Sequence, residues 1–69
     1  MNLQQGDLVL AVISDIEFYG KVIFDTEHAA LCIKCKDYNI SVPVCEVDSV
    51  HKLTGIDICK LGYKFISTF

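Results

Sequence analysis

The chain has 69 residues, of which 52% are hydrophobic and 22% are charged, and its formal net charge is −3. This apolar content excludes a disordered chain, and the length fits one small domain that buries only about 60% of its unfolded surface. All six basic residues are lysines, so the bidentate arginine contacts that read bases are missing, and we expect no nucleic-acid partner.

The N-terminal segment and the longest apolar run bear on where the protein resides. Residues 1–6 carry neither the basic stretch nor the apolar core of a signal peptide. The longest apolar run, Leu8 to Ile13, is far shorter than the roughly 20 residues that cross a bilayer. We therefore expect a cytoplasmic protein with no membrane partner, whose four cysteines stay reduced.

The first half of the chain predicts two β-strands joined by a loop. "DLVLAVIS" (7–14) is rich in β-branched residues and apolar on both faces, as expected for a strand in a strongly curved sheet. "DIEF" (15–18) is the loop that ends it, and "YGKVIF" (19–24) is the second strand, in which Gly20 indicates a bulge. "DTEH" (25–28) forms the next turn.

The third strand, "AALCIKCK" (29–36), decides how the cysteines are interpreted. Two thiols three residues apart in a strand point to opposite faces, so one ion cannot reach both Cys32 and Cys35. We therefore expect no metal and no cofactor. Alternation divides the strand into a core face and an outer face, Leu31, Ile33 and Cys35 against Cys32, Lys34 and Lys36. A zinc site on the Cys-x-x-Cys pair is the alternative, with distant ligands from Cys45, Cys59, His28 and His51.

An edge strand, a helical turn and a fifth strand are expected next. Residues 37–39 supply turn chemistry, and "ISVPV" (40–44) is the fourth strand. Pro43 cannot donate to a strand ladder, which places this strand at a sheet edge. "CEVD" (45–48) is a short helical turn before a strand over 49–53. The inward residues of the fourth strand are Ile40, Val42 and Val44.

The C-terminal segment, residues 56–69, is strongly apolar and is expected to be a sixth strand or an oligomerisation segment. A short helix over 57–61 competes with the first half of that strand. An apolar terminal strand must be covered by its own barrel or by another copy of the chain, so we expect a homo-oligomer. The expected interface residues are Leu61, Tyr63, Phe65 and Phe69.

The order of these elements predicts one domain over residues 1–69, a mainly β, small SH3-like antiparallel barrel of five to six strands. Such a barrel binds through the loops at one rim, here "SDIEFY" (14–19) and "CKDYN" (35–39). Aromatic side chains in these loops offer an apolar patch, and the acids attract a cationic ligand. The expected partner-binding residues are Asp15, Glu17, Phe18, Tyr19 and Tyr38.

Two resemblances to known families add to this interpretation. "GDLVLAV" (6–12) followed by "FYGKVI" (18–23) resembles the opening of Tudor-type barrels, whose aromatic cages bind methylated lysine or arginine. A longer set that includes "GKVIFDTEHAALCIK" (20–34) and "ISVPVCEVDSVHKLTGI" (40–56) is similar to the C-terminal barrel of the YopX family from phages and prophages of low-GC bacteria. The second resemblance implies an SH3-like fold and a phage origin, and therefore the cytoplasm of a host cell.

Motifs of catalysis are missing from the sequence. It holds no Gly-rich phosphate loop, no spaced acid pair and no histidine placed to activate a cysteine, so we expect no enzyme and no catalytic residues. The expected function is that of a small phage-type accessory protein that engages a host or defence protein, or sequesters a small ligand, through its loop rim. A Tudor-like module that binds peptide or nucleic acid and a zinc-stabilised interaction module are the alternatives.

Overall fold

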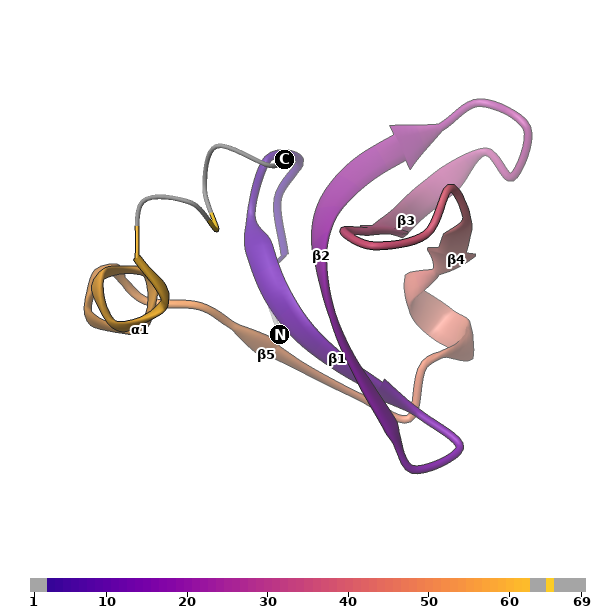
Figure 1. Cartoon of the computed structure of the whole chain (residues 1–69). Helices are drawn as coiled ribbons and strands as arrows, with labels where there is room; N and C mark the ends of the chain where they lie inside the picture. The colour runs from indigo at the N-terminus through magenta and orange to yellow at the C-terminus, as the bar shows by residue number, and fades with distance from the viewer. Residues whose placement is uncertain (1–2, 63–64, 66–69) are drawn as a thin grey trace.

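The computed structural model describes residues 3–62 and residue 65. A single antiparallel sheet of five strands is followed by a short helix (Figure 1). The elements in chain order are β1 (Leu8–Ile13), β2 (Ile16–Asp25), β3 (Ala30–Cys35), β4 (Ser41–Pro43), the 3₁₀ turn η1 (Val44–Glu46), β5 (Ser49–Lys52) and α1 (Gly55–Leu61).

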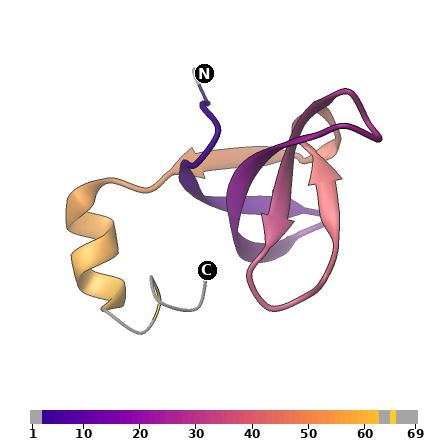
Figure 2. The ribbon, with the colours of Figure 1, turned by 90° about the horizontal axis from the view of Figure 1, so that it is seen from above.

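The strand order across the sheet is β4-β3-β2-β1-β5. The first four strands form a meander, and η1 carries the chain to the free edge of β1, where β5 pairs antiparallel. This confirms the mainly β class, and β5 forms within the expected range 49–53. The barrel itself is not closed, because β4 and β5 remain the two edges of the sheet within the described part of the chain. Strong bending of the sheet is visible in Figures 1 and 2.

The β1–β2 hairpin turns through two residues only. Ser14 and Asp15 both have positive φ, 49° and 65°, as in a type I′ turn, whose twist matches that of the flanking strands. The strand resumes at Ile16, so the predicted loop over 15–18 is wrong. Short polar side chains tolerate this left-handed geometry, and the Asp48 carboxylate accepts a hydrogen bond from the Ser14 N–H at 2.8 Å.

Gly20 lies in regular register opposite Val9 and Cys35, so the predicted bulge is wrong. A Cβ at this position would meet the Ile33 side chain and would lie 2.8 Å from the backbone oxygen of Lys34. Glycine is therefore required by the close approach of β3. It borders the centre of the core, which consists of Val9, Ala11, Val22 and Ile33, with Leu3, Phe18, Leu31, Val44, Val47 and Val50 packed around it.

The third and fourth strands confirm most of the predicted alternation. Ile33 and Cys35 are buried on the core face, and Cys32 lies on the other face, where it is buried as well. Pro43 lies in the edge strand β4, as predicted. Ile40 does not point inward as predicted, since it is 57% exposed and precedes the first residue of β4.

The segment after β5 forms a helix, so the sixth strand does not form over Gly55–Leu61 and the competing prediction holds there. Thr54 is the N-cap of α1 in a capping box, in which its hydroxyl accepts a hydrogen bond from the Asp57 N–H and the Asp57 carboxylate accepts one from the Thr54 N–H. Gly62, with φ of 87°, ends the helix. None of the helices within the described ranges is long and apolar enough to cross a membrane.

Candidate functional site

The aromatic residues of the predicted rim do not form a cage. Phe18 and Tyr19 are neighbours in β2, so their side chains lie on opposite faces of the sheet. Phe18 packs against the core cluster. Tyr19 makes an edge-to-face contact with Phe65, with ring centroids 5.0 Å apart and an interplanar angle of 77°. Tyr38, by contrast, is 67% exposed in the loop between β3 and β4.

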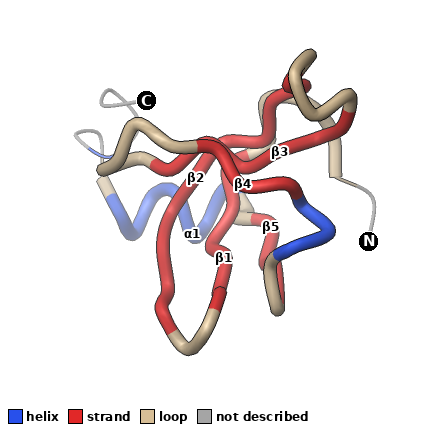
Figure 3. The backbone as a smooth tube through the Cα atoms, turned by 90° about the vertical axis from the view of Figure 1, so that its right-hand side faces the viewer, coloured by secondary structure: helices blue, strands red, loops and turns tan. Residues whose placement is uncertain are grey.

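The predicted rim residues fall into two separate regions. Asp15 and Glu17 are exposed at the tip of the β1–β2 hairpin, together with Asp48. Tyr38 belongs to the β3–β4 loop, which Figures 1 and 3 place away from that tip. The hairpin tip therefore offers negative charge without the aromatic partner that the sequence suggested.

The predicted oligomer residues are only partly described. Tyr63 and Phe69 lie outside the described residues. Leu61 is partly buried and lines a small groove against Tyr19 on the outer side of β1 and β5. Phe65 is 9% exposed and packs on Tyr19 of its own chain, while the Lys36 ammonium lies 5.7 Å from the centre of its ring.

A hollow of about 280 Å³ beside the β3–β4 loop gathers three of the six lysines. Lys21 and Lys34 stand directly opposite each other in the β2–β3 register, on the outer face of the sheet. Neither forms an ion pair with a carboxylate of the described residues, whereas Lys36 pairs with Asp37 at 3.5 Å. We call this site the lysine hollow, and its lining is Lys21, Lys34, Cys35, Lys36, Asp37, Tyr38 and Asn39.

Sequence reasoning missed the lysine hollow because its charges come from distant positions. Lys21 is the only lysine among the first 31 residues, which otherwise carry acids, so it looked isolated. The β2–β3 hairpin folds it against Lys34. The signal that could have found it is the hairpin register itself, because a turn over 26–29 places position 21 opposite position 34.

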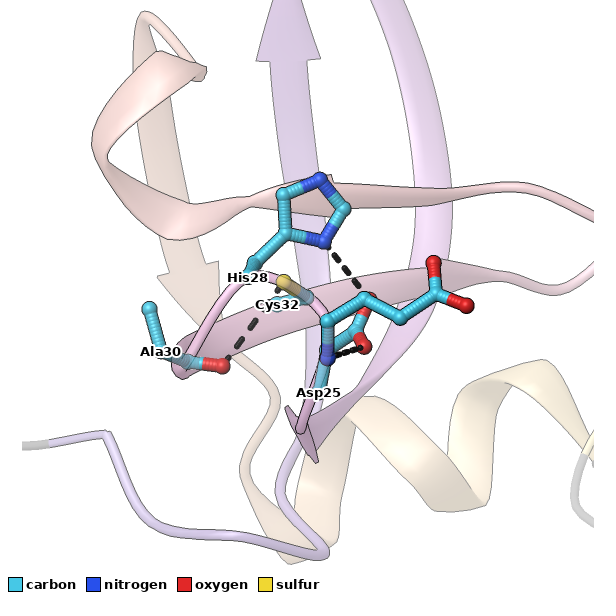
Figure 4. Close-up of polar contacts among 5 residues, drawn as sticks. Asp25, His28, Ala30 and Cys32 are labelled. Atoms are coloured by element: carbon cyan, nitrogen blue, oxygen red, sulfur yellow. Dashed lines mark hydrogen bonds and ion pairs between the residues drawn. The ribbon is translucent and has the colours of Figure 1, made fainter.

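The β2–β3 turn brings a carboxylate, an imidazole and a thiol together (Figure 4). One oxygen of the Asp25 carboxylate accepts a hydrogen bond from the Glu27 N–H at 2.9 Å, and the other lies 2.7 Å from Nδ1 of His28. Cys32 lies beside them in β3. One potential ligand atom from each of Asp25, His28 and Cys32 lies within 4.8 Å of the other two. We call these three residues the turn cluster.

The titration of the turn cluster follows from its contacts. The hydrogen bond with His28 is the main cause that lowers the pKa of Asp25, and the same bond raises the pKa of His28. Burial raises the pKa of the Cys32 thiol, which contacts the Ala30 carbonyl oxygen at 3.7 Å. An activated cysteine nucleophile needs a lowered pKa and access to substrate. The fully buried Cys32 has neither.

The four cysteines differ in burial. Cys32 and Cys35 lie on opposite faces of β3, as predicted, and burial raises the pKa of both thiols. Cys45 and Cys59 are exposed. What the sequence did not show is that Cys32 meets Asp25 and His28, because the turn folds these two residues back over the first residues of β3.

Comparison of the chain with protein-family models, with curated proteins and with solved structures gave no match in any of the three. Function must therefore be inferred from the two sites described above.

Proposed function

We propose that this protein is a small non-catalytic binding protein that engages an acidic segment of a partner protein through the lysine hollow. The carrying observation is that Lys21 and Lys34 face each other across β2 and β3 without a carboxylate partner among the described residues. Like charges directly opposite each other destabilise a sheet. An anionic group bound between them neutralises that repulsion, so binding of an anion also stabilises the sheet.

The surroundings of the hollow fit a peptide segment better than an isolated ion. Tyr38 and Ile40 expose their side chains in the adjoining β3–β4 loop, with exposed fractions of 67% and 57%. They offer apolar contact area next to the lysines, and an exposed aromatic side chain is a frequent anchor in interfaces. Tyr38 thus remains a binding residue, as expected from the sequence, but the ligand is anionic and not cationic.

The identity of the partner rests on the resemblance to the YopX family alone. It makes the partner a host or defence protein in the cytoplasm of a bacterial host cell. Self-association through the C-terminal segment belongs to the same proposal, and sedimentation of the intact chain tests it. A monomer at micromolar concentration would refute self-association and leave the lysine hollow unaffected.

A small anionic ligand is the second candidate, because the hollow of about 280 Å³ lies near the lower end of the volumes typical of ligand pockets. Inorganic phosphate and citrate are suitable probes. Saturable binding of either with no response to an acidic peptide would make the protein a small-anion binder instead.

The test is a fluorescence anisotropy titration with a labelled peptide of aspartate and glutamate that includes one phenylalanine. The double variant Lys21→Gln/Lys34→Gln is expected to bind at least about tenfold more weakly, which corresponds to about 1.4 kcal/mol. The matched control Lys52→Gln/Lys60→Gln removes the same charge elsewhere and should bind like the unaltered protein at the same salt concentration. Equal loss in both variants would show that net charge, and not the hollow, binds the peptide.

A further inference from the structure

The turn cluster combines three side chains that are all common metal ligands. The structure points to a second site, independent of the lysine hollow, and we propose that Asp25, His28 and Cys32 bind one Zn²⁺ ion at the β2–β3 turn. The sequence alternative paired Cys32 with Cys35. The fold instead pairs Cys32 with an imidazole and a carboxylate from the neighbouring turn.

The distances in the turn cluster are close to those of a tetrahedral site. Zinc holds thiolate, imidazole and carboxylate ligands at about 2.0–2.3 Å, which separates the ligand atoms by about 3.2–3.6 Å. Here each pair of ligand atoms lies within 4.8 Å, and Nδ1 of His28 is 2.7 Å from the Asp25 oxygen. His28 has a side chain that is 45% exposed, so rotation of its ring can open the space for an ion without disturbing the sheet.

The ligand set selects the kind of metal. A thiolate with an imidazole is typical of zinc and related transition metals, whereas calcium and magnesium prefer sites made of oxygen alone. Cys32 comes from a strand, and Asp25 ends the strand paired with it, so two of the three ligands are held by the sheet. Only the exposed His28 comes from the turn itself.

The charges around the turn cluster favour a cation. The Asp25 carboxylate belongs to the cluster, and the acidic side chains of Glu27 and Glu46 act electrostatically on His28. Glu46 belongs to η1, which begins directly after Pro43, the register partner of Cys32, and its charge also acts on the Cys32 thiol. No other His, Cys, Asp or Glu of the described residues joins the three ligand atoms within 4.8 Å, so a water molecule is the expected fourth ligand.

The binding step balances as a proton exchange. Cys32 releases its thiol proton and forms a sulfur–zinc bond, while the hydrogen bond between His28 and Asp25 breaks. His28 then binds through the ring nitrogen that carries no proton, and an imidazolium form first gives its extra proton to the buffer. A cysteine thiol carries its proton at neutral pH unless its pKa is lowered, since the ordinary pKa is about 8.5. Each bound zinc ion therefore releases at least one proton to the buffer.

A metal at this position would join the β2–β3 turn to the paired ends of β2 and β3. Domains of this size often need such a cross-link because their core alone is small. Zinc is therefore expected to raise the midpoint of thermal unfolding.

The experiment is a titration of the reduced full chain with Co²⁺, followed by displacement with Zn²⁺. We expect one ion per chain, a thiolate-to-cobalt charge-transfer band and the visible absorption of tetrahedral cobalt. Calorimetry in two buffers of different ionisation enthalpy should show the proton release. The variants are made in a Cys45→Ser/Cys59→Ser background, which removes the exposed thiols that bind metals nonspecifically but keeps all three proposed ligands.

In that background, His28→Gln and Asp25→Asn should each weaken cobalt binding by at least about 100-fold, since loss even of a residue that only hydrogen-bonds a metal ligand costs about 10–100-fold. Cys35→Ala is the matched control, because it removes the other buried thiol and should bind like the background protein. Circular dichroism in the presence of a chelator confirms that each variant is folded. Unchanged binding in His28→Gln, or loss of binding in the background protein itself, would overturn the proposal.

Discussion

The lysine hollow and the turn cluster lie on the same hairpin, but within the described residues the charged side chains are paired in the turn cluster and unpaired at Lys21 and Lys34 of the lysine hollow. In the turn cluster, His28 and Asp25 satisfy each other at 2.7 Å, and the second Asp25 oxygen accepts a backbone hydrogen bond. In the lysine hollow, Lys21 and Lys34 repel each other and find no carboxylate among the described residues. The first arrangement is stable without a ligand, and the second becomes favourable once an anion binds.

The two sites also differ in which part of the structure holds their side chains together. The turn cluster is local, because its three residues are spaced by three and four positions along the chain and a tight turn suffices to assemble them. The lysine hollow is held by the register of two strands, so it persists only as long as β2 and β3 stay correctly aligned. Local contacts therefore stabilise one site, and the rest of the sheet stabilises the other.

The largest expected effect comes from breaking the register that supports the lysine hollow. Gly20→Val places a branched side chain where a Cβ would already meet Ile33 and lie 2.8 Å from the Lys34 oxygen. We expect a loss of about 2–3 kcal/mol in the free energy of unfolding, because β3 must move away from β2. Urea unfolding measures it.

Gly55→Ala is the matched control for that substitution. A Cβ at Gly55 meets no atom within 4 Å, and alanine in a helix is better by up to about 1 kcal/mol. Stability should therefore stay the same or rise. A Gly20→Val variant that unfolds at the same urea concentration as the unaltered protein would show that β2 and β3 do not approach as closely as described.

The same contrast between local and distant contacts explains what could be predicted from the sequence. The alternation of apolar residues is sufficient to predict β3 and to place Cys32 and Cys35 on opposite faces of it. The mainly β class and the residue range of β5 also follow from the turn signals. These features depend on short segments whose pattern has a period of two.

The errors lie where one or two polar residues decide the outcome. The β1–β2 turn consists of Ser14 and Asp15 alone, because both residues adopt positive φ. The sequence pattern instead predicts a four-residue loop over 15–18. At the C-terminal end, the apolar alternation predicts a strand with a helix over 57–61 as its competitor, and the Thr54–Asp57 capping box and the terminating Gly62 define a helix over Gly55–Leu61. Both signals are visible in the sequence, and the hydrophobic pattern alone does not contain them.

The two sites were not predictable to the same degree. The spacing of Asp25, His28 and Cys32 across a predicted turn is a local pattern, and it could have been noticed once the turn was placed. The lysine hollow needed the pairing of position 21 with position 34. A shift of one residue in that register would move one of the lysines to the other face of its strand.

A smaller effect is expected from charge reversal in the lysine hollow. Lys21→Glu replaces the repulsion across β2 and β3 with an ion pair to Lys34, which should raise the free energy of unfolding by about 0.2–1 kcal/mol. The same variant should lose affinity for the acidic peptide. Urea unfolding at low and high salt measures the first effect, and the gain should shrink as salt screens the pair.

Lys60→Glu makes the same change of charge on the exposed face of α1. It lies in the last turn of the helix, where a negative charge is unfavourable, so no gain is expected. An equal gain in both variants would mean that general charge, and not the Lys21–Lys34 pairing, controls stability.

The smallest expected effect concerns the pH dependence of the turn cluster in the presence of a chelator. The pKa of His28 is raised above 6.5 and that of Asp25 is lowered below 3.8, mainly by their mutual hydrogen bond. The stabilisation from His28 is lost as pH rises through its raised pKa, and that from Asp25 is lost as pH falls through its lowered pKa. The stability difference between the unaltered protein and His28→Gln should therefore be largest between pH 3.8 and 6.5.

Thermal unfolding across that pH range measures the difference, and a double-mutant cycle assigns it. Asp25→Asn keeps an oxygen that can accept the Glu27 N–H bond and removes only the charge. The double variant with His28→Gln should then lose no more stability than either single variant, because the two changes remove one interaction. A stability difference that stays constant with pH would mean that the ring of His28 stabilises the turn by packing. The electrostatic interaction between His28 and Asp25 would then be weaker than their 2.7 Å contact indicates.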